Sequence, residues 1–201
     1  MKNWWYYHKW YVICGVTVIA IAIHLIGNAF GLWTKEPDYE IAYVGKTLLS
    51  EDEIHALEQA FISVSEDFNG DGSILVQVNQ YVKQNTDEDL GSQESVREEL
   101  EINAQISDVK LIGDIMDCES YFFLMDDPVA FQKAHQLLAM PDGSCPSNLD
   151  FSVEDKVIPW TGDFPVSNLY LGRRCFYEEK QCKNTEECSA LWDKLSKEAL
   201  Q

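Results

Sequence analysis

The chain has 201 residues, 46% of them hydrophobic and 12% aromatic, so it holds enough apolar surface for one packed domain and an appendage. Its net charge of −19 is unevenly placed: residues 1–33 contain two lysines and no acid, while the other 168 residues hold 13 basic and 34 acidic side chains, a balance of −21. A surface this negative repels phosphate backbones, which excludes nucleic acid as an expected partner.

The first element is an apolar segment at residues 10–33, WYVICGVTVIAIAIHLIGNAFGLW, which contains no Asp, Glu, Lys or Arg. At about 1.5 Å per residue it would form a helix of roughly 36 Å, enough to cross a bilayer core of about 30 Å. Tryptophan and tyrosine crowd its ends, as is typical of side chains at a membrane interface. The sequence therefore predicts a transmembrane helix at 10–33.

The charges on either side of this segment predict its orientation. Lysines precede it and acidic residues follow it, so the positive-inside rule puts residues 1–9 in the cytoplasm and residues 34–201 in an extracytoplasmic domain. The chain would then be a single-pass protein of the cell membrane with its C-terminal domain extracellular. A cleaved signal peptide is the alternative, because Gly27-Asn28-Ala29 offers a small-residue cleavage site. Signal-peptide cores usually have about 7 to 15 residues, which favours the uncleaved anchor.

One face of the predicted membrane helix is built largely from small residues. Its members recur at alternating spacings of three and four, and they are Thr17, Ala20, His24, Gly27 and Gly31. Small residues let helix backbones approach closely, so this stripe predicts helix packing with a second copy of the chain or with a partner transmembrane helix. The competing interpretation is ordinary span composition, because glycine is frequent in membrane helices.

The remaining sequence alternates strands and helices. We expect a strand at 39–44, a helix that opens at the capping box Ser50-Glu51-Asp52-Glu53 and runs to Val64, and a second strand at 74–82. A helix at about 94–112 and a third strand at 121–125 follow, and Asp126-Asp127-Pro128 then starts a third helix that extends through Met140.

This βαβαβα order predicts an α/β fold. Right-handed crossovers with helices on both faces favour a three-layer domain with a mainly parallel sheet of central order 2-1-3. Beyond Gly143, Pro146, Pro159 and Pro165 predict an irregular C-terminal covering segment. A further strand at 169–174 and a last helix from Thr185 are expected after it.

Several segments together resemble a known group of proteins. They are WWYYHKWY before the span, DYEIAYVGK at the start of the domain, DFNGDG followed by ILVQVNQYV, and ESYFFLMDDPVAFQ. The ensemble resembles uncharacterised bacterial single-pass membrane-anchored proteins whose outer domain is similar to one lobe of a type 2 periplasmic solute-binding protein. The resemblance covers most of the chain and implies an α/β lobe outside the membrane. It implies no activity, because the group is known by its pattern alone.

The DFNGDG segment matches the first half of a calcium loop. Loop positions one, three, five and seven are Asp67, Asn69, Asp71 and Ser73. Position twelve, where a bidentate Glu should complete the shell, is Val78, and a strand follows instead of a helix. A helix-to-strand turn held by Asn-Gly and Asp-Gly explains the same residues without metal. We therefore predict chiefly a turn, with weakly held calcium as the cofactor to test and no other cofactor.

A ligand site is predicted at the carboxyl ends of the first and third strands, where open α/β sheets bind their ligands. Lys46 and Thr47 follow the first strand, and Asp126 and Asp127 follow the third. The alternative is that Lys46 is a solvated loop charge and Asp127 a helix cap.

The outer domain has five cysteines: Cys118, Cys145, Cys175, Cys182 and Cys188. The odd number leaves at least one thiol unpaired. The last three are close enough in sequence for one local disulfide, and buried thiols are the alternative.

Two hypotheses about function remain open. The first is a membrane-anchored, extracytoplasmic protein that binds or scaffolds without catalysis, because no HExxH zinc pair or GxSxG elbow is present. The alternative is a metal-assisted hydrolase that uses Asp126 and Asp127 at the strand ends.

Overall fold

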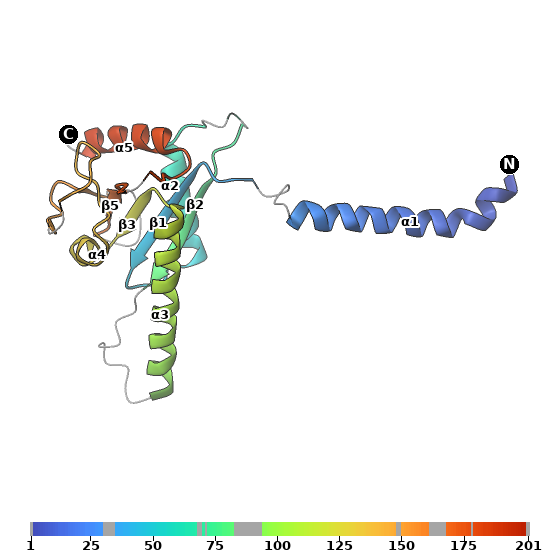
Figure 1. Cartoon of the computed structure of the whole chain (residues 1–201), viewed down its shortest axis with the longest axis horizontal. Helices are drawn as coiled ribbons and strands as arrows, with labels where there is room; N and C mark the ends of the chain where they lie inside the picture. The colour runs from blue at the N-terminus through green and yellow to red at the C-terminus, as the bar shows by residue number, and fades with distance from the viewer. Residues whose placement is uncertain are drawn as a thin grey trace. The chain divides into compact units, whose positions relative to one another are not determined.

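The computed structural model describes residues 2–29, 35–67, 70, 72–82, 94–147, 150–160, 168–177 and 179–199. The chain divides into two compact units, Met1–Glu36 and Pro37–Gln201. Helix α1 (Lys2–Ala29) belongs to the first, and the described part of the second holds four helices and a five-stranded sheet (Figure 1).

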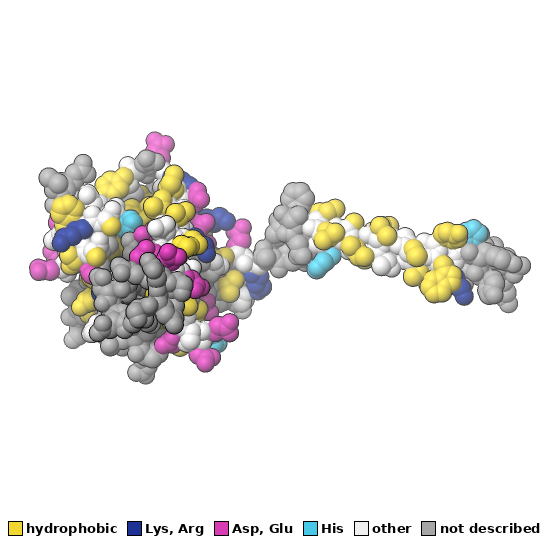
Figure 2. Space-filling view, turned by 90° about the horizontal axis from the view of Figure 1, so that it is seen from below, with side chains coloured by type: hydrophobic (Ala, Val, Ile, Leu, Met, Phe, Trp, Pro, Cys, Tyr) yellow, Lys and Arg dark blue, Asp and Glu magenta, His cyan; other side chains and the backbone are white. Residues whose placement is uncertain are grey.

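Helix α1 contains the segment His8–Gly27, which is long and apolar enough to cross a membrane, with a mean hydropathy of 2.1 and 6% of it buried. Figure 2 shows hydrophobic side chains along this helix, whereas acidic side chains are spread over the visible face of the other unit. The helix starts before the predicted residue 10, and the predicted end at 30–33 lies outside the described residues.

The predicted packing stripe on α1 is described in part. Thr17, Ala20 and His24 are exposed and Gly27 is buried, while Gly31 lies outside the described residues. The Thr17 hydroxyl donates to the Ile13 carbonyl at 2.9 Å, one turn back in the same helix. Packing of this stripe against another helix stays a prediction.

The sheet is mixed and has the order β2-β1-β3-β5-β4. Its strands are β1 (Tyr39–Gly45), β2 (Val76–Val82), β3 (Phe122–Met125), β4 (Val157–Pro159) and β5 (Tyr170–Arg173). β1 is parallel to β2 and to β3, so the predicted central order 2-1-3 is confirmed. The prediction of a mainly parallel sheet is wrong, because β5 is antiparallel to β3 and β4 is antiparallel to β5. The connection 160–169 between β4 and β5 is too short for the crossover of a dozen or more residues that parallel neighbours need.

Helices cover both faces of the sheet. On one face, Ile41 and Phe122 pack in a cluster with Leu57 and Phe61 of α2 (Glu51–Val64) and Trp192 of α5 (Thr185–Ala199). The other face is covered by α3 (Glu94–Asp117) and α4 (Pro128–His135), whose buried members include Leu111 and Phe131 around Phe123 and Met125. The alternating side chains of each strand supply both cores.

Helix α2 forms as its sequence predicts. The Ser50 hydroxyl accepts the Glu53 N–H at 3.4 Å, and the Glu53 carboxylate accepts the Ser50 N–H at 2.8 Å, which completes the capping box. Leu57 and Phe61 are fully buried, and the Phe61 ring stacks on Trp160 with centroids 4.5 Å apart. The capping box satisfies two amides at the start of the helix, and the apolar stripe holds it on the sheet.

α3 runs to Asp117, beyond the predicted end at about residue 112, α4 ends earlier than predicted, and one strand was not predicted. α4 ends at His135 rather than Met140, because Gln136 takes a left-handed conformation with φ of 54°. The next residues pair with the end of β5 instead: the Ala139 N–H donates to the Arg173 carbonyl at 2.9 Å, and the Cys175 N–H donates to Leu137 at 2.8 Å. β4 was missed, since its three residues fall in the segment predicted to be irregular and include a proline, which is tolerated on an edge strand.

Candidate functional site

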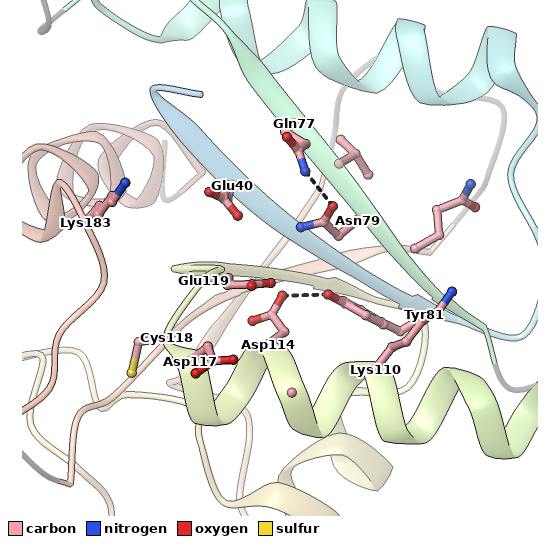
Figure 3. A pocket seen from close by; sticks show the side chains of 13 residues that line it. Glu40, Gln77, Asn79, Tyr81, Lys110, Asp114, Asp117, Cys118, Glu119 and Lys183 are labelled. Atoms are coloured by element: carbon pink, nitrogen blue, oxygen red, sulfur yellow. Dashed lines mark hydrogen bonds between the residues drawn. The ribbon is translucent and has the colours of Figure 1, made fainter. Parts of the chain in front are cut away.

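A cleft of about 860 Å³ lies between α3 and the strands β1 and β2 (Figure 3). In β2, the side chains of Gln77, Asn79 and Tyr81 alternate onto the face covered by α3. In β1, Glu40 shares that face with Ala42. Cleft residues from α3 and its surroundings are Lys110, Gly113, Asp114, Asp117, Cys118, Glu119 and Lys183.

The buried carboxylate of Asp114 links α3 to β2 on the two sides of the cleft. Its Oδ2 accepts the Tyr81 hydroxyl at 2.8 Å and the Ser120 hydroxyl at 2.6 Å. Its Oδ1 accepts the Ser120 N–H at 3.0 Å and lies 4.0 Å from Nη1 of Arg174. Asp114 is 2% exposed and Arg174 4% exposed. Each buried charge therefore needs the other to offset the free energy lost when it leaves water. The network joins the end of α3 to β2, to the turn before β3 and to the residue that follows β5.

Tyr81 is held as a neutral hydrogen-bond donor. Burial, followed by the charge of the Asp114 carboxylate, raises the pKa of Tyr81 far above its ordinary value. A phenol in this state donates to Asp114 and does not exchange protons with a substrate near neutral pH.

The lining of the cleft holds groups of both charges and two amides. The carboxylates belong to Glu40, Asp117 and Glu119, and the ammonium groups belong to Lys110 and Lys183. Asp117 is itself 3.3 Å from Nζ of Lys180. Gln77 Nε2 donates to Asn79 Oδ1 at 2.9 Å, as the dashed line in Figure 3 marks. The arrangement can accept and donate several hydrogen bonds, and its carboxylates favour a positively charged ligand group.

The predicted ligand residues lie beyond the carboxyl ends of β1 and β3. There the Lys46 N–H donates to Asp126 Oδ2 at 2.9 Å, which links the ends of β1 and β3. Asp127 Oδ1 accepts the Ala130 N–H at 2.9 Å and caps α4, as its helix-cap alternative predicts. Lys46, Asp126 and Asp127 line a smaller cleft of about 320 Å³ together with Phe131 and His135. Ligand binding at this cleft stays a prediction.

Thr47 is exposed, and its backbone carbonyl accepts the Tyr43 hydroxyl at 3.0 Å. A Cβ at Gly45 would collide with that hydroxyl, so glycine is needed where the chain turns past the Tyr43 ring. Burial raises the pKa of Tyr43 to about 12, and the Asp126 charge adds to the effect. The Tyr43 side chain beside the end of β1 is thus a neutral phenol.

The DFNGDG loop is held by the first of its carboxylates. Asp67 Oδ1 accepts the Gly70 N–H at 2.8 Å, and Oδ2 accepts the Gly72 N–H at 2.9 Å. Both glycines have positive φ, +72° and +82°, which suits their role in a turn. Ser73 is half-buried, and Asn69 and Asp71 lie outside the described residues. Among the residues that the structure describes, no three His, Cys, Asp or Glu gather as a metal site; calcium binding stays a prediction.

Comparison with known proteins adds nothing to this geometry. No family model, no curated protein and no solved structure matches the chain. The resemblance to one lobe of a solute-binding protein therefore stays a prediction.

The cysteines are free thiols, and most of them are buried. Cys118, Cys175, Cys182 and Cys188 are buried, Cys145 is half-buried, and Cys14 of α1 is exposed. Burial is the main cause that raises the pKa of Cys175, Cys182 and Cys188, each to about 12. Thiols in this state are poor nucleophiles at neutral pH, so they serve as core side chains.

Sequence reasoning missed the cleft beside α3. Its local signals were the single acid Glu40 in an apolar strand and the polar alternation of Gln77 and Asn79. Those signals could have predicted a polar patch on one face of β1 and β2. Asp114 has no such signal, since its partners Tyr81 and Arg174 are far away in sequence.

Proposed function

We propose that this chain is a single-pass membrane protein whose α/β domain works outside the cytoplasm as a non-catalytic binding protein. The support for the anchor is that α1 contains a 20-residue apolar segment with 6% of it buried. The support for the orientation is that Lys2 and Lys9 precede this segment, because basic residues beside a span favour the cytoplasmic side.

The ligand we propose is a small polar molecule with a positively charged amine and several hydrogen-bonding groups. One observation carries this proposal: the cleft is lined by carboxylates, lysines, amides and a phenol from β1, β2, α3 and two loops. Its volume of about 860 Å³ falls within the range of about 300–1,000 Å³ that small-molecule sites occupy. The carboxylates of Glu40 and Glu119 would meet the amine, and Gln77 and Asn79 would hydrogen-bond the rest of the ligand.

Binding without catalysis agrees with the state of the polar groups. Tyr81 is a neutral donor, and Asp114 already accepts three hydrogen bonds. Beyond the carboxyl end of β3, Asp126 and Asp127 each accept a backbone amide, which supports a structural role for both. Among the residues that the structure describes, no comparable observation supports the hydrolase alternative.

The test is a titration of the full chain in zwitterionic lipid nanodiscs with putrescine, arginine and glucose. We expect the two amines to bind and the neutral sugar not to bind. The double variant Glu40→Gln with Glu119→Gln should bind the amines at least about tenfold more weakly, about 1.4 kcal/mol. Glu154→Gln is the matched control, because Glu154 is an exposed acid outside the cleft. Absence of amine binding, or equal losses in both variants, would contradict the proposal.

A further inference from the structure

Helix α3 has two apolar faces that point in opposite directions. The inner face packs on the sheet, where Leu111 and Asp114 are almost fully buried. At 100° per residue, Ile102 and Val109 lie on the far side of the helix from Leu111. The other exposed large apolar residues of the helix share or border that far side. We call this set the outer stripe: Ile102, Ile106, Val109, Ile112 and Met116, with exposed fractions of 56%, 48%, 70%, 48% and 70%.

The outer stripe has the spacing of a helix-docking surface. Ile102, Ile106, Val109 and Met116 follow steps of four, three and seven residues, which keep apolar side chains on one line of a helix. From Ile102 to Met116 the line is about 21 Å long. Figure 1 shows the amino-terminal half of α3 extending past the lower end of the sheet. The exposed fractions of the stripe residues leave their side chains accessible to a partner helix. An apolar surface of this length on one helix is typical of an interaction site.

The charges beside the outer stripe select the occupant. The exposed or half-buried acids on α3 are Glu98, Glu99, Glu101, Asp108 and Asp117. Among the α3 side chains that the structure describes, the basic one is Lys110. Some of these acids have partners within the domain, such as Lys180 for Asp117, yet the flanks remain mostly negative. We propose that the outer stripe docks an amphipathic helix of another protein that has lysine or arginine on both sides of its apolar face. Charge complementarity would orient that helix, and the apolar contact would supply most of the affinity.

The two other occupants are disfavoured by the same charges. A two-fold contact between copies brings the same patch of each copy together, so the acids beside one stripe would face the acids beside the other. An anionic membrane surface attracts helices with basic flanks and repels acidic ones. No residue of the outer stripe lines the cleft, so the inference holds whether or not the cleft binds an amine.

The experiment measures binding of two synthetic 21-residue helical peptides to the full chain in zwitterionic nanodiscs by fluorescence anisotropy. Both peptides have leucine at heptad positions a and d and alanine elsewhere; one has lysine and the other glutamate at positions e and g. We expect the lysine peptide to bind and the glutamate peptide to bind at least about tenfold more weakly, with the difference shrinking as salt is added.

Matched variants assign the binding to the outer stripe. The double variant Ile106→Ser with Val109→Ser should bind the lysine peptide at least about tenfold more weakly, because the substitutions remove apolar area from the contact. Leu48→Ser with Val129→Ser is the control, since both residues are exposed apolar side chains elsewhere in the domain, and it should leave affinity within about twofold. Urea unfolding of each variant confirms that the protein is folded.

Four results would overturn the inference. They are equal binding of both peptides, no binding of either, retained binding by the Ile106→Ser, Val109→Ser variant, and self-association of the parent chain that this variant abolishes. The last result would assign the outer stripe to a second copy of the chain.

Discussion

Helices α2 and α3 pack on opposite faces of the same sheet, but they relate differently to their sequences. α2 has one apolar stripe, which the sheet buries at Leu57 and Phe61. α3 has two, and the sheet covers the one that contains Leu111 and leaves Val109 70% exposed. The comparison teaches that apolar spacing predicts a helix in both cases, whereas only tertiary packing decides which apolar face belongs to the core.

The largest expected effect tests the polar attachment of α3. Asp114→Ala removes the acceptor of Tyr81 and Ser120 and leaves Arg174 buried beside them without its carboxylate. Loss of one partner of a buried pair costs about 3–5 kcal/mol of unfolding free energy. Urea unfolding monitored by circular dichroism measures it. A loss below about 1 kcal/mol, the size of a solvated surface pair, would show that α3 is held by its apolar contacts alone.

The second prediction compares an inner position of α2 with an outer position of α3. Leu57→Ala should cost about 2–5 kcal/mol, because Leu57 is fully buried and its removal leaves a cavity. Val109→Ala should cost less than about 0.5 kcal/mol, as expected for an exposed side chain. The same urea titration checks both. Similar losses would mean that the outer stripe is covered within the protein, and the contrast between the helices would fail.

The smallest expected effect is a loss of stability at alkaline pH. It concerns one tyrosine on each face of the sheet, Tyr43 under α2 and Tyr81 under α3. Burial raises the pKa of both above the ordinary value of 10.0, that of Tyr43 to about 12. A raised pKa in the folded state contributes stability that is present in full below pH 10 and is lost as the pH rises toward 12. Between pH 9 and pH 11 we expect a loss on the order of 1 kcal/mol per tyrosine.

Phenylalanine variants separate the two faces. Tyr43→Phe and Tyr81→Phe should each show a shallower decline of stability over this pH range than the parent, since each removes one ionisable group. The absolute stability of Tyr81→Phe will fall as well, because Asp114 loses a donor. A decline as steep as the parent's in both variants would show that other groups dominate the alkaline response.

Features that depend only on residues close together in the sequence could be predicted. The capping box of Ser50 and Glu53, and the start of α4 at Asp127, are local arrangements that form wherever the chain enters a helix. The end of α4 was not predictable, because Gln136 has no local reason to adopt positive φ; that conformation fits because the next residues pair with the end of β5. The cleft beside α3 joins Glu40, Tyr81 and Asp114 across three elements, so its geometry comes from the tertiary fold.

The sequence likewise did not predict which face of α3 packs on the sheet. In the sequence, Val96, Leu100, Ala104 and Val109 lie near helical spacing, but Leu111 and Asp114 are the described residues of α3 that are buried. A carboxylate in the core is an unfavourable guess from sequence, and it is stable here because Arg174 and three donors surround it.

The central claim is that α1 anchors an acidic binding domain outside the cytoplasm, and protease treatment of intact protoplasts that express the full chain tests it most directly. We expect added protease to remove the domain from about Lys35 onward and to leave a membrane-protected fragment that contains α1. A cytoplasmic marker protein must stay intact, and detergent must then expose it. Survival of the full-length chain on intact protoplasts, with digestion only after lysis, would contradict the orientation and the proposed function together.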